Sequence, residues 1–330
     1  MDLTDAYGRK IEYLRISLTD KCNLRCSYCM PSEGVKRLSH TDVLTLEEIL
    51  RVSRVMTDMG VCRIRLTGGE PLVRKGIETL VQSLGELDKK PELALTTNGV
   101  LLADKLEAFY GAGLRSVNIS LDTLNRETYA SLTGTDALTE VLSAIEQALS
   151  MGFKVKLNAV SIQGVNDKEL PALAAFARDR AIDVRFIELM PIGCGARHKG
   201  IPQDVVMDML EDKFGKADKA PDAEAPIAGL RGPAEYVSFK DFKGNVGFIS
   251  PMSHSFCESC NRVRLTVDGM LKLCLYYPDG LDVKKLIREG ASDKELAEAI
   301  REGILKKPEK HCFSETNDSE EKRSMYEIGG

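Results

Sequence analysis

The stretch "RISLTDKCNLRCSYCM", residues 15–30, places three cysteines within eight positions. Cys22, Cys26 and Cys29 follow an apolar strand pattern directly, in C-x3-C-x2-C spacing. A 4Fe–4S cubane has four irons, so three thiolates leave one iron open to a small molecule. Structural zinc would need a fourth protein ligand, and His40 lies beyond a proline and a glycine in no helical register. We therefore expect an iron–sulfur cluster in this loop.

Strand and helix patterns alternate six times between residues 11 and 190. The strand segments are 12–18, 62–68, 92–98, 114–122, 153–160 and 183–190. Helices are expected near 45–60, 76–88, 103–112, 137–151 and 168–180. Such repeats produce parallel strands joined by right-handed crossovers, in either a barrel or an open doubly wound sheet.

The alternation of polar and apolar residues within each strand separates these two folds. A doubly wound sheet is covered on both faces, so its strands are apolar almost throughout. Here Leu14 and Ile16 share one face of a strand and Arg15 lies on the other. Solvent-facing antiparallel strands would also alternate, but the intervening helices argue against them. We predict an α/β fold, a partial (β/α)6 TIM-like barrel whose polar faces line a lumen.

The predicted lumen is basic. The inward positions include Arg15, Arg63, Arg65, Lys156 and Arg185, and we expect no matching inward carboxylates. Buried cations require anions, and a di- or triphosphate would supply them. The net charge is −5, with 45 basic and 50 acidic residues, which argues against a broad nucleic-acid-binding surface.

Composition predicts a cytoplasmic protein. No apolar run approaches the length of a membrane span, and the N-terminal sequence does not resemble a signal peptide. The nine cysteines argue for thiolates rather than disulfides. Six of them fall into two triplets, and Cys62, Cys194 and Cys312 are expected to be buried or idle thiols.

The pattern changes after residue 190, which divides the chain into a barrel domain, 1–190, and a C-terminal domain, 191–330. The second domain is predicted to contain hairpins that turn near 243–245 and 268–269, and helices near 282–289 and 293–305. We assign no function to the connection 216–233. The polar tail that follows Phe313 is expected to be mobile.

A second triplet, Cys257, Cys260 and Cys274, spans the latter hairpin. By spacing alone it would bind zinc with His254 as fourth ligand, or a second cluster with one open iron. Arg262 and Arg264 share a strand face beside it, which predicts an anion-binding pair near a metal.

The first triplet resembles that of the radical S-adenosylmethionine (SAM) superfamily. Tyr28 fits the aromatic position between the last two cysteines, and "TGGEP", residues 67–71, follows the second strand. The resemblance implies that the open iron chelates the amino and carboxylate groups of SAM. Glycines let the backbone of the second motif approach the SAM amino group closely.

The whole chain resembles the GTP 3′,8-cyclase family of molybdenum cofactor biosynthesis. The fragments that carry this resemblance, by their order and spacing, are "TTNG", "VNISLDTL", "VKLNAV", "RFIELMP", "CNRVRLT" and the terminal "GG". It implies conversion of GTP to (8S)-3′,8-cyclo-7,8-dihydroguanosine 5′-triphosphate. A 5′-deoxyadenosyl radical made from SAM would remove hydrogen from ribose C3′, and C3′ would then attack guanine C8.

The resemblance also assigns site residues. SAM would be contacted by Tyr28, Gly69, Glu70, Ser120 and Met190. GTP would be contacted by Arg15, Arg63, Arg65, Thr96, Lys156, Arg185, Arg262, Val263 and Arg264. Arg262, Arg264, Gly329 and Gly330 would act in catalysis. The second triplet would hold a second 4Fe–4S cluster that meets guanine, which favours the cluster over zinc.

The implied partners are an electron donor of flavodoxin or ferredoxin type and cyclic pyranopterin monophosphate synthase, which would take the product. We expect a monomer or homodimer that binds neither nucleic acid nor membrane. Two alternatives stay open: another radical SAM enzyme with an auxiliary cluster, acting on a peptide or a tRNA base, and a zinc-binding interaction module.

Overall fold

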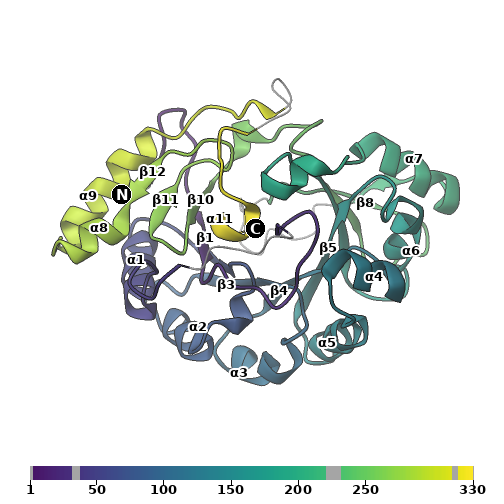
Figure 1. Ribbon diagram of the computed structural model, residues 1–330, viewed down its shortest axis with the longest axis horizontal. Helices are drawn as coiled ribbons and strands as arrows, with labels where there is room; N and C mark the ends of the chain where they lie inside the picture. The colour runs from purple at the N-terminus through teal and green to yellow at the C-terminus, as the bar shows by residue number, and fades with distance from the viewer. Residues whose placement is uncertain (1–2, 32–37, 221–231, 314–318, 330) are drawn as a thin grey trace.

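A computed structural model describes residues 3–31, 38–220, 232–313 and 319–329 (Figure 1). The predicted strands form β1 (Tyr13–Ser17), β2 (Arg63–Thr67), β3 (Glu92–Thr97), β4 (Ser116–Ser120), β5 (Lys154–Ser161) and β6 (Asp183–Glu188). Each pairs in parallel with the next. The predicted (β/α)6 partial barrel is therefore confirmed.

Two strands from the C-terminal half extend this barrel. β10 (Arg262–Leu265) pairs in parallel with β1, and β9 (Val246–Ile249) pairs in parallel with β6. The sequence predicted both segments only as arms of hairpins. The register places the second cysteine triplet beside the first strand of the barrel, because Tyr13 lies opposite Arg262.

Antiparallel strands form both edges of the sheet. β11 (Met270–Lys272) and β12 (Gly280–Asp282) follow β10, while β8 (Glu235–Ser238) and β7 (Asp218–Lys219) follow β9. Both predicted hairpins are confirmed, as β8–β9 and β10–β11. Within the described part of the chain, the sheet runs from β12 to β7 without closing on itself.

Helices cover the outer face of the barrel (Figure 1). They are α1 (Leu46–Asp58), α2 (Ile77–Gly85), α3 (Leu106–Gly111), α4 (Arg126–Thr133), α5 (Leu138–Ser150), α6 (Leu170–Ala175) and α7 (Gln203–Phe214). The second half adds α8 (Val283–Arg288), α9 (Asp293–Leu305) and the short α11 (Met325–Ile328). Helices α4 and α7 were not predicted, whereas α8 and α9 lie where we expected them.

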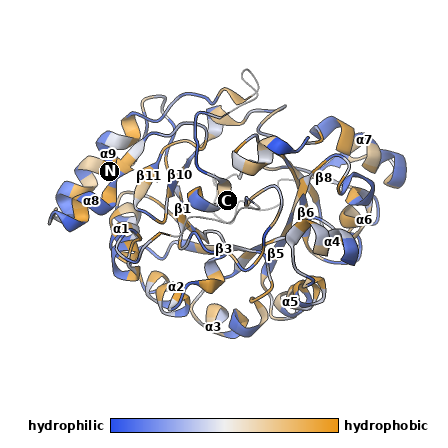
Figure 2. Ribbon diagram, viewed as in Figure 1, coloured by the Kyte–Doolittle hydropathy of each residue, from blue (hydrophilic) through white to orange (hydrophobic). Residues whose placement is uncertain are grey.

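The core lies between the strands and these helices. Leu14, Ile16, Ile64 and Leu66 have no exposed surface, as their outward register predicts. Figure 2 shows the apolar residues of the helices gathered toward the sheet and the polar residues toward solvent. Helix α1 begins with a capping box, in which Thr45 and Glu48 satisfy each other's backbone N–H groups.

The tail that was expected to be mobile is packed where the structure describes it. Tyr326 and Ile328 are buried, and Ile328 contacts a small apolar cluster with Ile192, Tyr276 and Phe313. The C-terminus lies at the opening of the barrel (Figure 1). The prediction weighed the polar composition of this segment and overlooked its few apolar anchors.

No helix among the described residues is both long and apolar enough to cross a membrane. The boundary near residue 190 stays a prediction, although strands from both sides of it share one sheet.

Gly244 should tolerate no side chain. A Cβ there would lie 1.8 Å from the carbonyl oxygen of Ile182, a backbone atom at the start of β6. We expect Gly244→Ala to lower the free energy of unfolding by about 1–3 kcal/mol, as overpacking does. Urea unfolding of the purified protein measures this. The control is Gly111→Ala, where no atom lies within 4 Å; equal midpoints for the two variants would contradict the prediction.

Candidate active site

The barrel lumen contains a cavity of about 410 Å³. All five basic residues predicted to face inward line it, as do both cysteine triplets. The predicted inward register of the strands is thus confirmed. The cavity joins residues from the two ends of the sequence, because β10 lies directly beside β1.

Two of the five basic residues have carboxylate partners, so the expectation of unmatched cations was wrong for them. Arg63 Nη2 lies 2.6 Å from Glu92 Oε2, and Lys156 Nζ lies 3.0 Å from Asp183 Oδ2. Each carboxylate is the register partner of its cation on the neighbouring strand. Lateral pairing of this kind becomes visible only when the strands are aligned.

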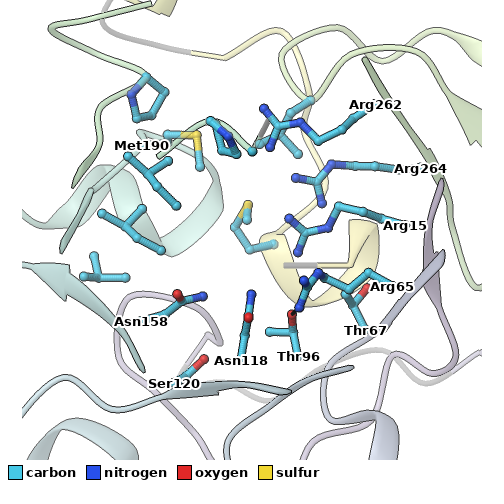
Figure 3. A pocket seen from close by; sticks show the side chains of 18 of the residues that line it. Arg15, Arg65, Thr67, Thr96, Asn118, Ser120, Asn158, Met190, Arg262 and Arg264 are labelled. Atoms are coloured by element: carbon cyan, nitrogen blue, oxygen red, sulfur yellow. Dashed lines mark hydrogen bonds between the residues drawn. The ribbon is translucent and has the colours of Figure 1, made fainter. Parts of the chain in front are cut away.

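Three arginines form a row across adjacent strands. Arg65 on β2 lies opposite Arg15 on β1, which lies opposite Arg264 on β10. Figure 3 shows them, with Arg262, pointing into the cavity from one wall. Burial, together with repulsion from Arg262, lowers the pKa of Arg264 to about 10. Like charges on neighbouring strands repel one another, so an anion bound here would stabilise the wall.

Several buried polar atoms of the wall have no hydrogen-bond partner among the described residues. They include Arg185 Nε and Nη2, Asn118 Oδ1 and Asn158 Oδ1. Asn118 and Asn158 point into the cavity beside Ser120 (Figure 3). Since unpaired buried polar groups are costly, these atoms indicate a polar ligand. Both asparagines lie on the polar face of their strands, but the sequence offered no reason to select them, because an uncharged amide carries no separate signal.

The first triplet fits an iron–sulfur cluster. The Leu24 N–H donates to Cys22 Sγ at 3.4 Å, and the Asn98 side-chain amide donates to the same sulfur at 3.7 Å. Burial and then the neighbouring thiols Cys22 and Cys194 raise the pKa of Cys29 to about 12. A bound metal would supply the positive charge that holds these side chains as thiolates. No three His, Cys, Asp or Glu side chains in the described ranges converge to hold a single ion, whereas each iron of a cluster takes its own thiolate.

Four residues assigned to SAM line the cavity, namely Tyr28, Gly69, Ser120 and Met190. The Tyr28 hydroxyl donates to Asp122 Oδ2 at 2.8 Å. Gly69 packs on the cysteine loop so closely that a Cβ would lie 2.5 Å from the Lys21 carbonyl oxygen. The "TGGEP" motif and the cysteine loop therefore meet, as predicted.

Glu70, the fifth residue assigned to SAM, does not line the cavity. Its carboxylate accepts hydrogen bonds from Leu72 N (3.0 Å), Thr97 Oγ1 (2.8 Å) and Asn98 N (2.7 Å). Burial raises its pKa to about 7. The side chain thus holds the loop after β2 against the end of β3, next to the Asn98 amide that contacts Cys22.

The second triplet lies among basic groups. Burial would raise the pKa of Cys260, but Lys307 and Arg262 outweigh it and bring the pKa to about 7. Burial would likewise raise the pKa of Cys257, but nearby His311 and the Ser255 hydroxyl, which donates to the Cys257 sulfur at 3.2 Å, bring the pKa to about 7. These thiols ionise readily and suit a metal cluster. His311 and Lys307 were missed, because neither lies in a ligand-like spacing with the cysteines.

His254, the proposed zinc ligand, is exposed and does not line the cavity that holds the triplet. Its Nδ1 lies 2.8 Å from Ser253 Oγ. The structure therefore does not bring His254 into a four-ligand zinc site with the second triplet.

The described end of the tail contacts the arginine row. Arg264 Nη1 donates to the carbonyl oxygen of Gly329, and Gly330 lies outside the described residues. Gly329 has a φ of +79°, and a Cβ would lie 2.8 Å from Thr67 Oγ1. Only glycine fits this left-handed backbone and close approach without strain.

Comparison with known proteins agrees with this geometry. Residues 16–177 match the family described as Radical SAM superfamily, and residues 182–313 match Molybdenum Cofactor Synthesis C. The GTP 3′,8-cyclase of Clostridium perfringens is 45% identical, over 99% of this chain and 100% of that protein. That of Pelotomaculum thermopropionicum is 46% identical, with the same coverage.

A solved structure shares the fold. Streptococcus suis SuiB bound to S-adenosylmethionine superposes with a TM-score of 0.65 and 16% identity, over 97% of this chain and 78% of that one. The partial barrel, with a cysteine triplet after its first strand, defines a radical SAM protein. Within that class, the chain belongs to the GTP 3′,8-cyclase family.

A buried ion pair anchors the tail. Lys272 Nζ pairs with Glu321 and donates to the Tyr277 carbonyl oxygen at 2.6 Å. Although burial raises it, Arg323 and Lys272 hold the pKa of Glu321 at about 2. Removing one partner of a buried pair costs about 3–5 kcal/mol, so Lys272→Met should release the tail.

Limited proteolysis with mass spectrometry measures this release as faster cleavage after residue 319. Lys285→Met, which removes an exposed lysine 3.9 Å from Glu289, is the matched control. Equal cleavage rates for both variants would show that the pair does not anchor the tail.

Proposed function

We propose that the protein is a GTP 3′,8-cyclase, which converts GTP to (8S)-3′,8-cyclo-7,8-dihydroguanosine 5′-triphosphate in the first step of molybdenum cofactor biosynthesis. The observation that carries this proposal is a single cavity lined by two cysteine triplets and a row of arginines. Relatives that match nearly the whole chain and bear this name support it.

The enzyme uses SAM and an iron–sulfur cluster, as its superfamily does. We propose two 4Fe–4S clusters, each with one open iron. Cys22, Cys26 and Cys29 would hold the first, whose open iron binds SAM. Cys257, Cys260 and Cys274 would hold the second, whose open iron faces the guanine of GTP.

The arginine row, Arg65, Arg15 and Arg264, would bind the triphosphate, and Arg185 has two nitrogens free to join it. Arg262, the Val263 backbone and the Thr96 hydroxyl line the same wall. Arg63 and Lys156 would also contribute to triphosphate binding, although each is paired with a carboxylate, Glu92 and Asp183 respectively. Tyr28, Gly69, Ser120 and Met190 would contact SAM, and Glu70 would position the loop that does so.

A cluster held by Cys22, Cys26 and Cys29, with SAM bound, would supply the radical chemistry that removes hydrogen from ribose C3′ and, with one further electron and a proton, joins C3′ to guanine C8. The residues of this chain orient both molecules and exclude water from them. Gly329 accepts a hydrogen bond from Arg264 and lies close to Thr67 and Ser17. We propose that Arg262, Arg264, Gly329 and Gly330 act together at this point in the reaction.

The remaining expectations belong to the same proposal. A flavodoxin or ferredoxin would deliver electrons, cyclic pyranopterin monophosphate synthase would take the product, and the cytoplasm would house a monomer or homodimer. Residues 1–190 would form the radical SAM domain and residues 191–330 the domain of the second cluster.

Anaerobic incubation of the reconstituted protein with SAM, dithionite and a panel of nucleotides tests the function. We expect 5′-deoxyadenosine and the cyclised triphosphate from GTP only. Cyclisation of no nucleotide, with SAM cleavage stimulated instead by a peptide or a tRNA, would favour another radical SAM enzyme.

Substitutions in the two triplets should affect different activities. Cys26→Ser should abolish SAM cleavage, because it removes an anchor of the first cluster. Cys260→Ser should retain SAM cleavage while cyclisation of GTP is lost. Chromatography of 5′-deoxyadenosine and of the nucleotide product measures both activities. Loss of both activities in both variants would argue for a purely structural second site.

Arg185→Met should weaken the binding of GTP far more than the binding of guanosine. Its side-chain nitrogens lack partners among the described residues and are free for phosphate oxygens. A charge-assisted hydrogen bond is worth about 1.5–3 kcal/mol, or about 10- to 150-fold in Kd. Equilibrium dialysis measures both ligands, with the exposed Arg126→Met as control. A similar loss for GTP and guanosine would exclude a phosphate contact.

A further inference from the structure

Residues 307–311, which follow α9, lie next to the second cysteine triplet. Lys307 is only 3% exposed. Its Nζ donates to the carbonyl oxygen of Arg262 at 3.1 Å and to that of Leu273. Arg262 follows Cys260 by two residues, and Leu273 directly precedes Cys274. One buried ammonium group therefore joins the chain just after Cys260, at the start of β10, to the chain just before Cys274, at the end of β11.

Arg9 joins the third cysteine to the same segment. Its Nη1 donates to the carbonyl oxygens of Cys257 at 2.9 Å and Glu309 at 2.7 Å. Asp5 holds this guanidinium from the other side, at 2.5 Å. His311, at the end of the segment, lines the same cavity as Cys257. The hydrogen bonds of Lys307 and Arg9 thus tie together all three chain positions that would hold the cluster.

The surroundings of the two triplets differ in charge. The carboxyl groups of Glu70 and Asp122 act on Cys22 and Cys26 of the first triplet, and the cation of Arg25 opposes Glu70 at Cys22. Lys307 and Arg262 are the cations that act on Cys260 of the second. A reduced cluster carries one more negative charge than an oxidised one, so nearby cations stabilise it and raise its reduction potential. Burial strengthens the effect, because little water screens the charge of Lys307.

We propose that Lys307 is a positioning residue for the second cluster. It fixes the chain segments next to Cys260 and Cys274 relative to each other, and its charge raises the reduction potential of that cluster. The proposal rests on the proposed function, since it requires a cluster on Cys257, Cys260 and Cys274. Lys307 belongs to neither cysteine motif, so the proposal assigns a role in the chemistry to a residue outside both motifs.

The test uses the full chain, reconstituted anaerobically, as wild type, Lys307→Met, Lys307→Arg and Lys306→Met. Lys306 is the exposed neighbour and serves as control. Iron and sulfide analysis counts the clusters, and a redox titration followed by electron paramagnetic resonance resolves their midpoint potentials. SAM cleavage without GTP reports on the first cluster independently.

In Lys307→Met we expect the midpoint of one cluster to shift to a more negative value, or the loss of about half of the iron, about four of eight atoms. SAM cleavage should persist in either case. Lys307→Arg should restore the midpoint because it keeps the charge, and Lys306→Met should match wild type. If Lys307→Met does not fold, Lys307→Gln, which removes the charge but keeps a hydrogen-bond donor, should shift the same midpoint in the same direction.

Wild-type midpoints and full iron in Lys307→Met would overturn the proposal, and so would equal shifts in the methionine and arginine variants. An unshifted midpoint in Lys307→Gln would overturn it where that variant is used. A wild-type protein with only about four irons would instead contradict the proposed second cluster, so the two failures can be told apart.

Discussion

The row formed by Arg65, Arg15 and Arg264 is the constraint on which the rest of the site depends. Parallel pairing of β2, β1 and β10 sets these guanidinium groups side by side with their charges facing one lumen. Burial and mutual repulsion lower the pKa values of Arg15 and Arg264. Such a wall is stable when an anion lies against it. The register of the strands therefore favours a polyanionic ligand in the lumen.

The C-terminal half completes this site as part of the barrel. β10 supplies Arg264 and brings the second triplet next to β1, and β9 extends the opposite side beyond β6. The tail returns to the mouth and is held there by the ion pair of Lys272 and Glu321. Residues separated by most of the chain thus share one cavity, in which a ligand can touch both cysteine triplets.

The sequence alone predicted the barrel and most of its site. Alternation along each strand predicted which residues face inward, because the side-chain period of a strand does not depend on its neighbours. The spacing of Cys22, Cys26 and Cys29 predicted a cluster at the mouth for an equally local reason. The resemblance carried by ordered motifs then supplied the identity of the ligands, and the relatives at 45–46% identity agree with it.

Only the tertiary structure decided what depends on lateral or distant contact. It paired Arg63 with Glu92 and Lys156 with Asp183, which the sequence had left unmatched. It also placed His311, rather than His254, on the cavity of the second triplet and buried Tyr326 and Ile328 of the polar tail. Strand order, register and the return of the chain are set by the burial of residues far apart in the sequence, and no local periodicity records them.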